Sequence, residues 1–362
     1  NPFFAPLIEI CRKNGIQYRV FMPDLRPISG YGENAGSSWF LEWGQIALRK
    51  VLHRLWCGSE TSMYRFIGKT LALLTFGVFR ADICITNAGI YMDFLPAMNP
   101  HSRIVDLQHG VIYSTHPGYF DAQGRLLPLR DKESQIEYWV YGEGYRDCFF
   151  KNPQNARRLL GKVHVVGDVL RDTSPLELES LPLSQRTMIL FSFQFVNDFT
   201  VEKLNEMKRI IEQMLSQVAK TSSMQAFQWR FRHHPRFSNC ISLSDWEWKF
   251  PWFKETHSPI NEILPSLFSN VTFNSTMAFD VASRGVPTIF LDNAALGWKN
   301  VFFTEYDYPF PVMTINDLIG MNENEYVRIE TRLKKWYALY YSPFDTSLVK
   351  MLLLKSTKKS KV

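Results

Sequence analysis

The sequence lacks the features that define several large classes of protein. Its five cysteines are widely spaced, odd in number and never arranged as C-x-x-C, which argues against a structural zinc site and against an extracellular disulfide set. No apolar run is long enough to span a bilayer, and nothing near the beginning resembles a signal peptide. We therefore expect a protein of the reducing cytoplasm without a membrane span.

Familiar catalytic and binding fingerprints are also missing. The chain has no G-x-G-x-x-G, no P-loop, no H-E-x-x-H and no G-x-S-x-G, so dinucleotide enzymes, P-loop NTPases and common hydrolases lack their signatures. It has no zinc-finger, RNA-recognition or basic-zipper pattern either, and we expect no nucleic-acid partner.

Apolar and aromatic residues are abundant. Hydrophobic residues make up 46% and aromatic residues 15% of 362 residues, enough for two or three sizeable cores. The net charge is only +6, and its densest run is the tail with Lys355, Lys358, Lys359 and Lys361. A solvated terminus explains such a tail, and so does peripheral contact with an anionic membrane.

Short apolar strands alternate with helical segments along most of the chain, which predicts doubly wound α/β domains with parallel sheets. The pattern restarts after residues 164–168 and a connection rich in proline and serine. We predict an N-terminal domain over 1–165, a C-terminal domain over 166–335, and a terminal helix with the basic tail over 336–362. The stretch up to Gly58 is expected to be a long loop leading into helices, and a first strand is expected before residue 1.

Polar residues follow four of the predicted strands. Since parallel α/β sheets bind ligands beyond the carboxyl ends of their strands, these residues are candidates for function. They are Gln108, His109, His116 and Tyr119 in the first domain, and Gln194, Asp198, Arg232, His234, Pro235, Asn274, Ser275 and Thr276 in the second.

The segment with Asn274, Ser275 and Thr276 joins a strand to a helix. Hydroxyls and free backbone N–H groups at a helix start suit a phosphate, although an ordinary helix cap by Ser275 or Thr276 explains the same residues. Asp198 also has two interpretations: a catalytic role as base or nucleophile, or a structural role as the cap of the following helix. His234 and Pro235 suit a phosphate-binding loop or a simple turn.

Taken together, these segments resemble the GT-B glycosyltransferases, which pair two Rossmann-like domains around an interdomain active-site crevice. The pairs His234-Pro235 and Ser275-Thr276 look like the motifs of bacterial enzymes that use CMP-sugars, such as sialyltransferases and Kdo transferases. Gln108-His109-Gly110 and the segment from His116 to Tyr119 look closest to the retaining β-Kdo transferases of O-antigen biosynthesis.

The resemblance implies a transferase that moves an acidic sugar from a CMP donor to a lipopolysaccharide, O-antigen or capsule glycan. It places the donor on the C-terminal domain, with His234, Ser275 and Thr276 at the phosphate and Arg232 at the sugar carboxylate. It places a carboxylate nucleophile at Asp198. No Asp-x-Asp motif occurs, so we expect neither a metal nor a cofactor besides the donor itself.

The sequence also departs from these families. The acidic triplet that supplies the base of sialyltransferases is absent, with only Glu143-Gly144 as a partial counterpart. If the enzyme inverts, the base is Glu143, Asp106 or His109. Two other functions stay open: a transferase or epimerase using CDP-glycerol or a UDP-sugar, and a non-catalytic module that binds nucleotides or glycans.

Overall fold

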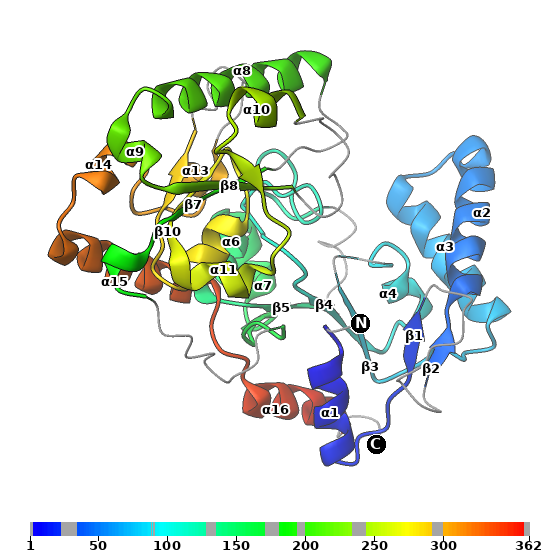
Figure 1. Cartoon of the computed structure of the whole chain (residues 1–362). Helices are drawn as coiled ribbons and strands as arrows, with labels where there is room; N and C mark the ends of the chain where they lie inside the picture. The colour runs from blue at the N-terminus through cyan, green and yellow to red at the C-terminus, as the bar shows by residue number, and fades with distance from the viewer. Residues whose placement is uncertain are drawn as a thin grey trace. The chain divides into compact units, whose positions relative to one another are not determined.

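The computed structural model describes residues 3–22, 35–87, 89, 91–127, 135–170, 181–193, 200–233, 244–291 and 300–357. The chain forms two compact units: unit 1 comprises Asn1–Ser174 and Tyr340–Val362, and unit 2 comprises Pro175–Leu339 (Figure 1). None of the described helices combines the length and the apolar sequence needed to cross a bilayer.

Unit 1 is built on a parallel sheet of four strands whose spatial order, β3-β4-β5-β6, follows the chain. A separate parallel pair, β1 with β2, precedes it. The strands are β1 (Val20–Met22), β2 (Ala35–Ser37), β3 (Ile83–Asn87), β4 (Arg103–Leu107), β5 (Ile136–Val140) and β6 (Val163–Val165). The helices are α1 (Ala5–Lys13), α2 (Trp39–Leu55), α3 (Glu60–Leu74), α4 (Leu95–Met98), α6 (Glu143–Phe150), α7 (Pro153–Leu159) and α16 (Thr346–Thr357).

The expectation of a long loop up to Gly58 is wrong in its second half, because residues 39–55 form α2. Leu41, Leu48 and Leu52 recur at helical spacing and pack against the α3 side chains Met63 and Ile67. The helix forms because this apolar stripe has a partner, which outweighs the glycine and serine residues before it.

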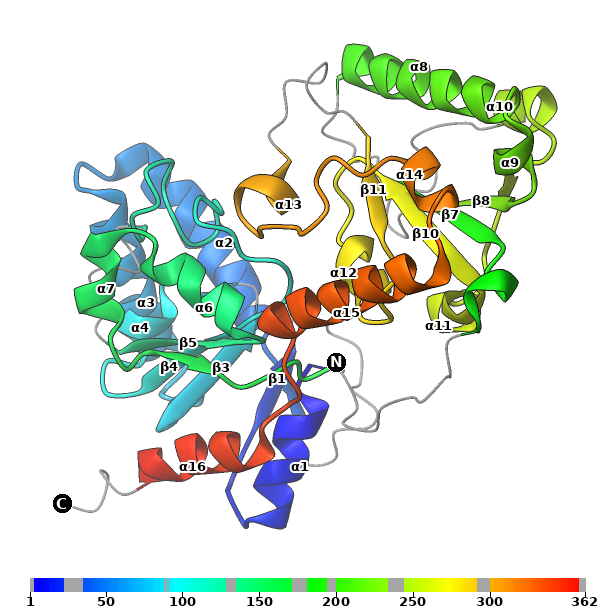
Figure 2. The ribbon, with the colours of Figure 1, turned by 90° about the vertical axis from the view of Figure 1, so that its left-hand side faces the viewer.

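The C-terminal segment returns to unit 1. Backbone hydrogen bonds join Asp168 to Ser342 and Asp345 to Val166. Gly167 has a φ of +82°, and a Cβ there would collide with the backbone carbonyl of Pro343. Beyond this segment, α16 lies beside α1 (Figure 2).

These contacts explain where the domain boundaries fall. The sequence placed the first boundary after residue 165, and the structure places it after Ser174, because residues 166–168 bond within unit 1. It placed the second before residue 336, but α15 belongs to unit 2 up to Leu339. Trp336 is held there by its ring, which stacks on Phe279 at 4.7 Å.

Unit 2 is built on a parallel sheet with the order β11-β10-β7-β8-β9. Its strands are β7 (Met188–Ser192), β8 (Gln228–Arg232), β9 (Lys254–Glu255), β10 (Leu267–Thr272) and β11 (Thr288–Phe290). Its helices are α8 (Val201–Val218), α9 (Ser222–Gln225), α10 (Ser244–Lys249), α11 (Ile260–Ile263), α12 (Met277–Ala282), α13 (Val301–Thr304), α14 (Ile315–Ile319) and α15 (Glu323–Tyr340), with short 3₁₀ turns at Leu183–Gln185 and Leu264–Ser266.

Helices cover both faces of the unit 2 sheet. All six residues of the β10 strand are buried, as expected of a parallel strand between two helical layers. Figure 2 shows α8 and α10 on one face and α11, α12 and α15 on the other. The prediction of two α/β domains with parallel sheets is confirmed.

Candidate functional site

The unit 2 sheet reverses its winding direction between β7 and β10. From β7 the chain adds β8 and β9 on one side and then β10 and β11 on the other. In such sheets the loops after the two central strands diverge at their carboxyl ends, and ligands bind there. The segments after Ser192 and Thr272 occupy this position in unit 2.

A buried polar row joins three strands just below this edge. The Ser192 hydroxyl donates to the Asn270 carbonyl oxygen Oδ1 at 2.6 Å, and Nδ2 of Asn270 donates to the Thr288 hydroxyl at 3.2 Å. All three side chains are buried. Polar groups satisfied in this way fix the relative register of β7, β10 and β11.

Thr272 connects the end of β7 to the loop after β10. Its hydroxyl donates to the Ser192 carbonyl at 2.7 Å and accepts the Ser275 N–H at 3.3 Å. The loop is therefore held by its own side chains before any ligand binds, and Thr272 is a positioning residue.

The predicted supply of free N–H groups at the start of α12 is wrong for its first three residues. The Ser275 hydroxyl accepts the Met277 N–H at 3.2 Å, and the N–H groups of Ala278 and Phe279 donate to backbone carbonyls. Ser275 thus acts as the helix cap that the sequence left open as the alternative. The side chain of Thr276 is exposed.

Two buried polar atoms at this edge have no hydrogen-bond partner among the described residues. They are Oδ1 of Asn274, two residues beyond β10, and Nδ1 of His233, directly after β8. The His233 ring lies 5.7 Å from the Phe193 ring and 5.8 Å from the Phe231 ring. A buried polar group without a hydrogen bond lowers the stability of the fold by about 1–3 kcal/mol. A ligand that forms hydrogen bonds to these atoms removes that cost, which favours its binding.

Burial lowers the pKa of His233, and His257 adds to that effect while Glu255 opposes it. The imidazole is therefore neutral at pH 7, with one nitrogen donating and the other accepting. His233 and Asn274 follow strands that flank β7 on either side. Two strand spacings separate these strands, about 10 Å, a distance that a ligand of nucleotide size bridges.

The other predicted residues of unit 2 divide into two groups. Arg232 is described: its guanidinium donates to the Ser258 carbonyl at 2.7 Å from the end of β8. Its role at a sugar carboxylate stays a prediction. Gln194, Asp198, His234 and Pro235 lie outside the described residues.

In unit 1, the side chain of the candidate residue Gln108 is buried and bonded within the protein. It is 1% exposed, its Nε2 donates to the Gly110 carbonyl at 2.6 Å, and its Oε1 accepts the Tyr141 N–H at 2.8 Å. The Tyr141 hydroxyl donates to the Gln108 carbonyl, and burial raises the pKa of Tyr141 and keeps it protonated. Gln108 therefore braces the ends of β4 and β5.

The two histidines after β4 differ in exposure. His109 is exposed, with its ring 4.7 Å from the Phe3 ring. His116 is partly buried, and its Nδ1 accepts the Gly118 N–H at 3.0 Å, which makes Nε2 its donor when neutral. Tyr119 is buried against Phe149 at 5.6 Å, so its ring contributes to the core rather than to an open surface.

The candidate bases of unit 1 also differ in access. Glu143 begins α6 directly after β5, with a side chain 51% exposed and 2.6 Å from Arg146. Asp106 is buried, and its Oδ1 accepts the Gly89 N–H at 3.0 Å, which suits a structural carboxylate. Within the described ranges, no three His, Cys, Asp or Glu side chains cluster as metal ligands would.

Comparison with known proteins finds similarity in structure. No protein-family model matches the chain, and no curated protein matches it in sequence. Among solved structures, the wall teichoic acid polymerase TagF is 14% identical, with 98% of this chain and 85% of that chain covered and a TM-score of 0.49. The glycosyltransferase SnogD from Streptomyces nogalater is 11% identical, with 97% and 95% covered and a TM-score of 0.48.

A third similar structure is MnaA from S. aureus with UDP, which is 12% identical, with 99% and 93% covered and a TM-score of 0.45. All three TM-scores lie below 0.5.

Sequence reasoning missed two residues of the unit 2 edge. His233 precedes His234 in the sequence. In β8, buried and less buried residues alternate, with Trp229 and Phe231 buried, so the next residue on the buried face is His233. Thr272 lies at the end of an apolar strand, and no sequence motif includes it. Only the partners of its hydroxyl distinguish it from an ordinary strand threonine.

Proposed function

We propose that this protein is a glycosyltransferase that transfers an acidic sugar, Kdo or a sialic acid, from its CMP donor to a cell-surface glycan. The observation that carries the proposal is a pair of buried atoms without a hydrogen-bond partner among the described residues, Nδ1 of His233 and Oδ1 of Asn274, which follow the two strands beside β7. A position where the sheet reverses direction, with polar groups lacking partners, is suited to a nucleotide.

Unit 2 binds the donor in this proposal. Asn274 accepts a hydrogen bond from the ligand, while the exposed Thr276 hydroxyl and His234 contact the phosphate. Neutral His233 offers one further hydrogen bond beside the Phe193 ring. Gln194 and Pro235 complete the loops after β7 and β8, and Arg232 faces the sugar carboxylate, where a guanidinium forms charge-assisted hydrogen bonds.

The chemistry begins with cleavage of the bond between the anomeric carbon and the phosphate oxygen, whose electron pair leaves with CMP. The anomeric carbon of an ulosonic acid is tertiary, so positive charge develops readily on it. Asp198 then bonds to that carbon. The acceptor hydroxyl attacks the same carbon, gives its proton to a base such as Glu143 or His109, and releases the Asp198 carboxylate. If the enzyme inverts, Asp198 or Glu143 instead takes the proton of the attacking hydroxyl.

Unit 1 binds the acceptor glycan in this proposal. His109 and His116 offer imidazole nitrogens near the end of β4, and Glu143 is an exposed carboxylate after β5. Gln108 and Tyr119 support this edge from the core instead of contacting the sugar. Transfer to lipopolysaccharide, O-antigen or capsule would take place at the cytoplasmic side of the membrane.

A thermal-shift panel with CMP, CDP, UDP and GDP tests the donor class. A ligand at 100 times its dissociation constant that binds only the folded state stabilises it by about 2.7 kcal/mol. We expect a selective rise with CMP that His233→Ala and Asn274→Ala diminish. A response to CDP or UDP would favour the CDP-glycerol or UDP-sugar enzymes, and CMP binding without turnover would favour a non-catalytic module. No response to any nucleotide would contradict the site.

A further inference from the structure

Helices α2 and α3 form a pair in unit 1 with an unusual amount of exposed apolar surface. They lie side by side in both overall views (Figures 1 and 2). Of the 18 large hydrophobic side chains that are exposed among the described residues, nine lie between residues 40 and 78. This segment is about a tenth of the chain, so the exposed apolar residues are concentrated here.

The outward side of α2 carries a regular apolar stripe. Phe40, Trp43, Val51 and Leu55 are exposed, and the helical repeat puts them within about 120° of one another on the helix. Leu41, Leu48 and Leu52 lie on the adjacent side of the helix, centred about 100° from that stripe, and pack against the core of unit 1. The helix therefore carries apolar side chains toward the core of unit 1 and, on the adjacent side, toward solvent.

The outward side of α3 continues this surface. Phe66, Leu73 and Leu74 are exposed, and the turn that follows presents Phe76 with 94% of its surface accessible. The Phe66 ring also lies 5.4 Å from the Trp56 ring just beyond α2, which joins the two helices on this side.

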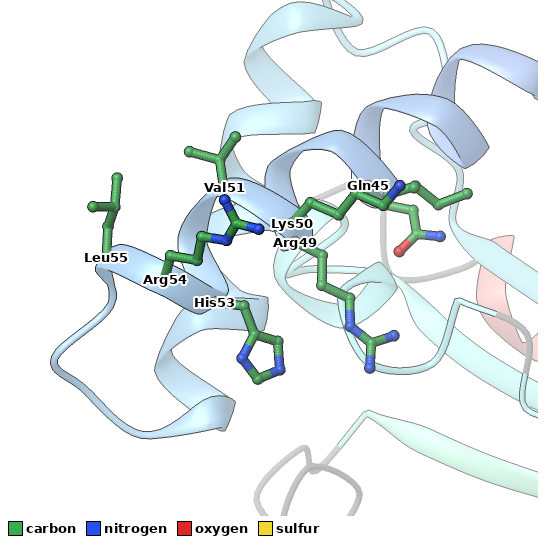
Figure 3. Close-up of a pocket in the computed structure, with 8 residues that line it drawn as sticks. Gln45, Arg49, Lys50, Val51, His53, Arg54 and Leu55 are labelled. Carbon is green, nitrogen blue, oxygen red and sulfur yellow. The ribbon is translucent and has the colours of Figure 1, made fainter.

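Basic side chains are interleaved with these apolar ones. Residues 39–80 contain six Lys or Arg and only two acidic residues, a surplus of four in a chain whose total is +6. Lys50, Arg54 and Lys69 form no ion pair among the described residues. Figure 3 shows Lys50 and Arg54 on the same stretch of α2 as Val51 and Leu55.

We propose that the α2–α3 pair is a docking surface for an anionic lipid bilayer, with both helices lying in the plane of the interface. Exposed aromatic and aliphatic side chains insert at the level of the headgroups, and unpaired Lys and Arg beside them neutralise lipid phosphates. Charge favours this occupant over a second copy of the chain, because a two-fold contact through this surface would place unpaired cations close to one another.

Co-sedimentation of the full chain with vesicles tests the proposal. We expect the chain to bind vesicles of phosphatidylcholine that contain about 30–40% of the anionic lipid phosphatidylglycerol. Binding to vesicles of pure phosphatidylcholine should be weaker by about tenfold or more. Trp43→Ser with Phe76→Ser is expected to reduce binding about tenfold or more. Lys50→Glu with Arg54→Glu is expected to do the same and to weaken the dependence on salt.

Matched changes in unit 2 serve as controls. Trp248→Ser with Val312→Ser removes two side chains that are each 88% exposed, and Lys334→Glu with Lys335→Glu reverses two exposed charges of α15. Neither is expected to change vesicle binding. Neutralising Lys358, Lys359 and Lys361 separates the terminal tail from the helix pair.

Three results would overturn the proposal: equal binding to neutral vesicles, equal loss in the unit 2 controls, or loss on neutralising the tail alone. A dimer in sedimentation velocity that Trp43→Ser dissociates, without vesicle binding by the unaltered chain, would assign the surface to a second copy instead. Urea unfolding curves without nucleotide check that the variants are folded, and they keep this test independent of the proposed function.

Discussion

The carboxyl edges of the two sheets handle polar groups in opposite ways. In unit 1, Gln108 uses both ends of its amide, and Asp106 accepts the Gly89 N–H. In unit 2, the row through Ser192 and Asn270 is satisfied, but His233 and Asn274 above it keep buried atoms without described partners. Among the described residues, the polar side chains named at the unit 1 edge are paired, whereas one atom each of His233 and Asn274 at the unit 2 edge is not.

The difference follows from strand order. The four strands of the unit 1 sheet run in chain order, so β4 and β5 are neighbours and their ends bond to each other through Gln108 and Tyr141. In unit 2 the order reverses beside β7, so β8 and β10 flank β7 on opposite sides. Thr272 bonds the end of β7 to the loop after β10, but His233 and Asn274 follow strands that are not neighbours and so do not pair with each other.

The largest expected effect is on turnover. Asp198→Ala is expected to lower CMP release from CMP-Kdo or CMP-N-acetylneuraminic acid about 100-fold or more, because it removes the proposed nucleophile or base. His234→Ala is expected to lower release through loss of a phosphate contact. His109→Ala is the matched change in unit 1 and leaves CMP binding unaltered. Undiminished release in both Asp198→Ala and His234→Ala would show that the site lies elsewhere.

A structural change in unit 1 comes next. Gln108→Ala leaves the Tyr141 N–H and the Gly110 carbonyl without their side-chain partner and creates a cavity. The free energy of unfolding should fall by about 3 kcal/mol. Urea denaturation measures it. Gln154→Ala, at an exposed position of α7, should change stability by less than about 0.5 kcal/mol. If Gln108→Ala is as stable as Gln154→Ala, the edge of unit 1 is not braced as described.

The stability of unit 1 should depend on pH through the partly buried carboxylate of Glu137. Burial alone would raise the pKa of Glu137, but hydrogen bonds from Arg103 and His164 bring it down to about 2. Because the folded pKa is depressed, the stabilisation is complete above about pH 5 and is lost as the pH falls toward 2, by about 2–3 kcal/mol.

Unfolding curves of Glu137→Gln measure this contribution. The variant should be less stable at pH 7 and should lose less further stability on acidification, whereas Glu262→Gln, at an exposed position in unit 2, should follow the unaltered chain. Parallel acid profiles of Glu137→Gln and the unaltered chain would contradict the assignment.

The smallest effect separates binding from stability at one residue. Asn274→Ala removes a buried oxygen that has no partner among the described residues, so the free energy of unfolding should stay the same or rise by about 1 kcal/mol. The dissociation constant for CMP should nevertheless rise about tenfold, which corresponds to 1.4 kcal/mol. Asn316→Ala, on the exposed side of α14, should change neither. Lower stability with unchanged CMP affinity would make Asn274 a structural residue.

Much of the fold was predictable because local patterns matched it. The strands β3, β4, β5 and β10 coincide with short apolar runs of the sequence, and α8 and α15 coincide with segments of helical pattern. The long loop expected before Gly58 failed, since α2 depends on its contact with α3. The polar residues after the strands could be chosen as candidates from sequence alone. Parallel strands place their carboxyl ends at one edge of the sheet, and ligands bind at that edge.

The sequence by itself determined the alternation of strands and helices, and therefore two parallel sheets with polar residues after their strands. Only the tertiary structure decided which of those polar groups are satisfied. Gln108 was a candidate for function and is buried and bonded, while His233 was overlooked and keeps a buried atom without a partner among the described residues. Likewise, the sequence of α2 does not tell which of its apolar side chains are buried and which are exposed. Hydrogen-bond satisfaction and burial depend on neighbours that are distant along the chain, and local sequence does not encode them.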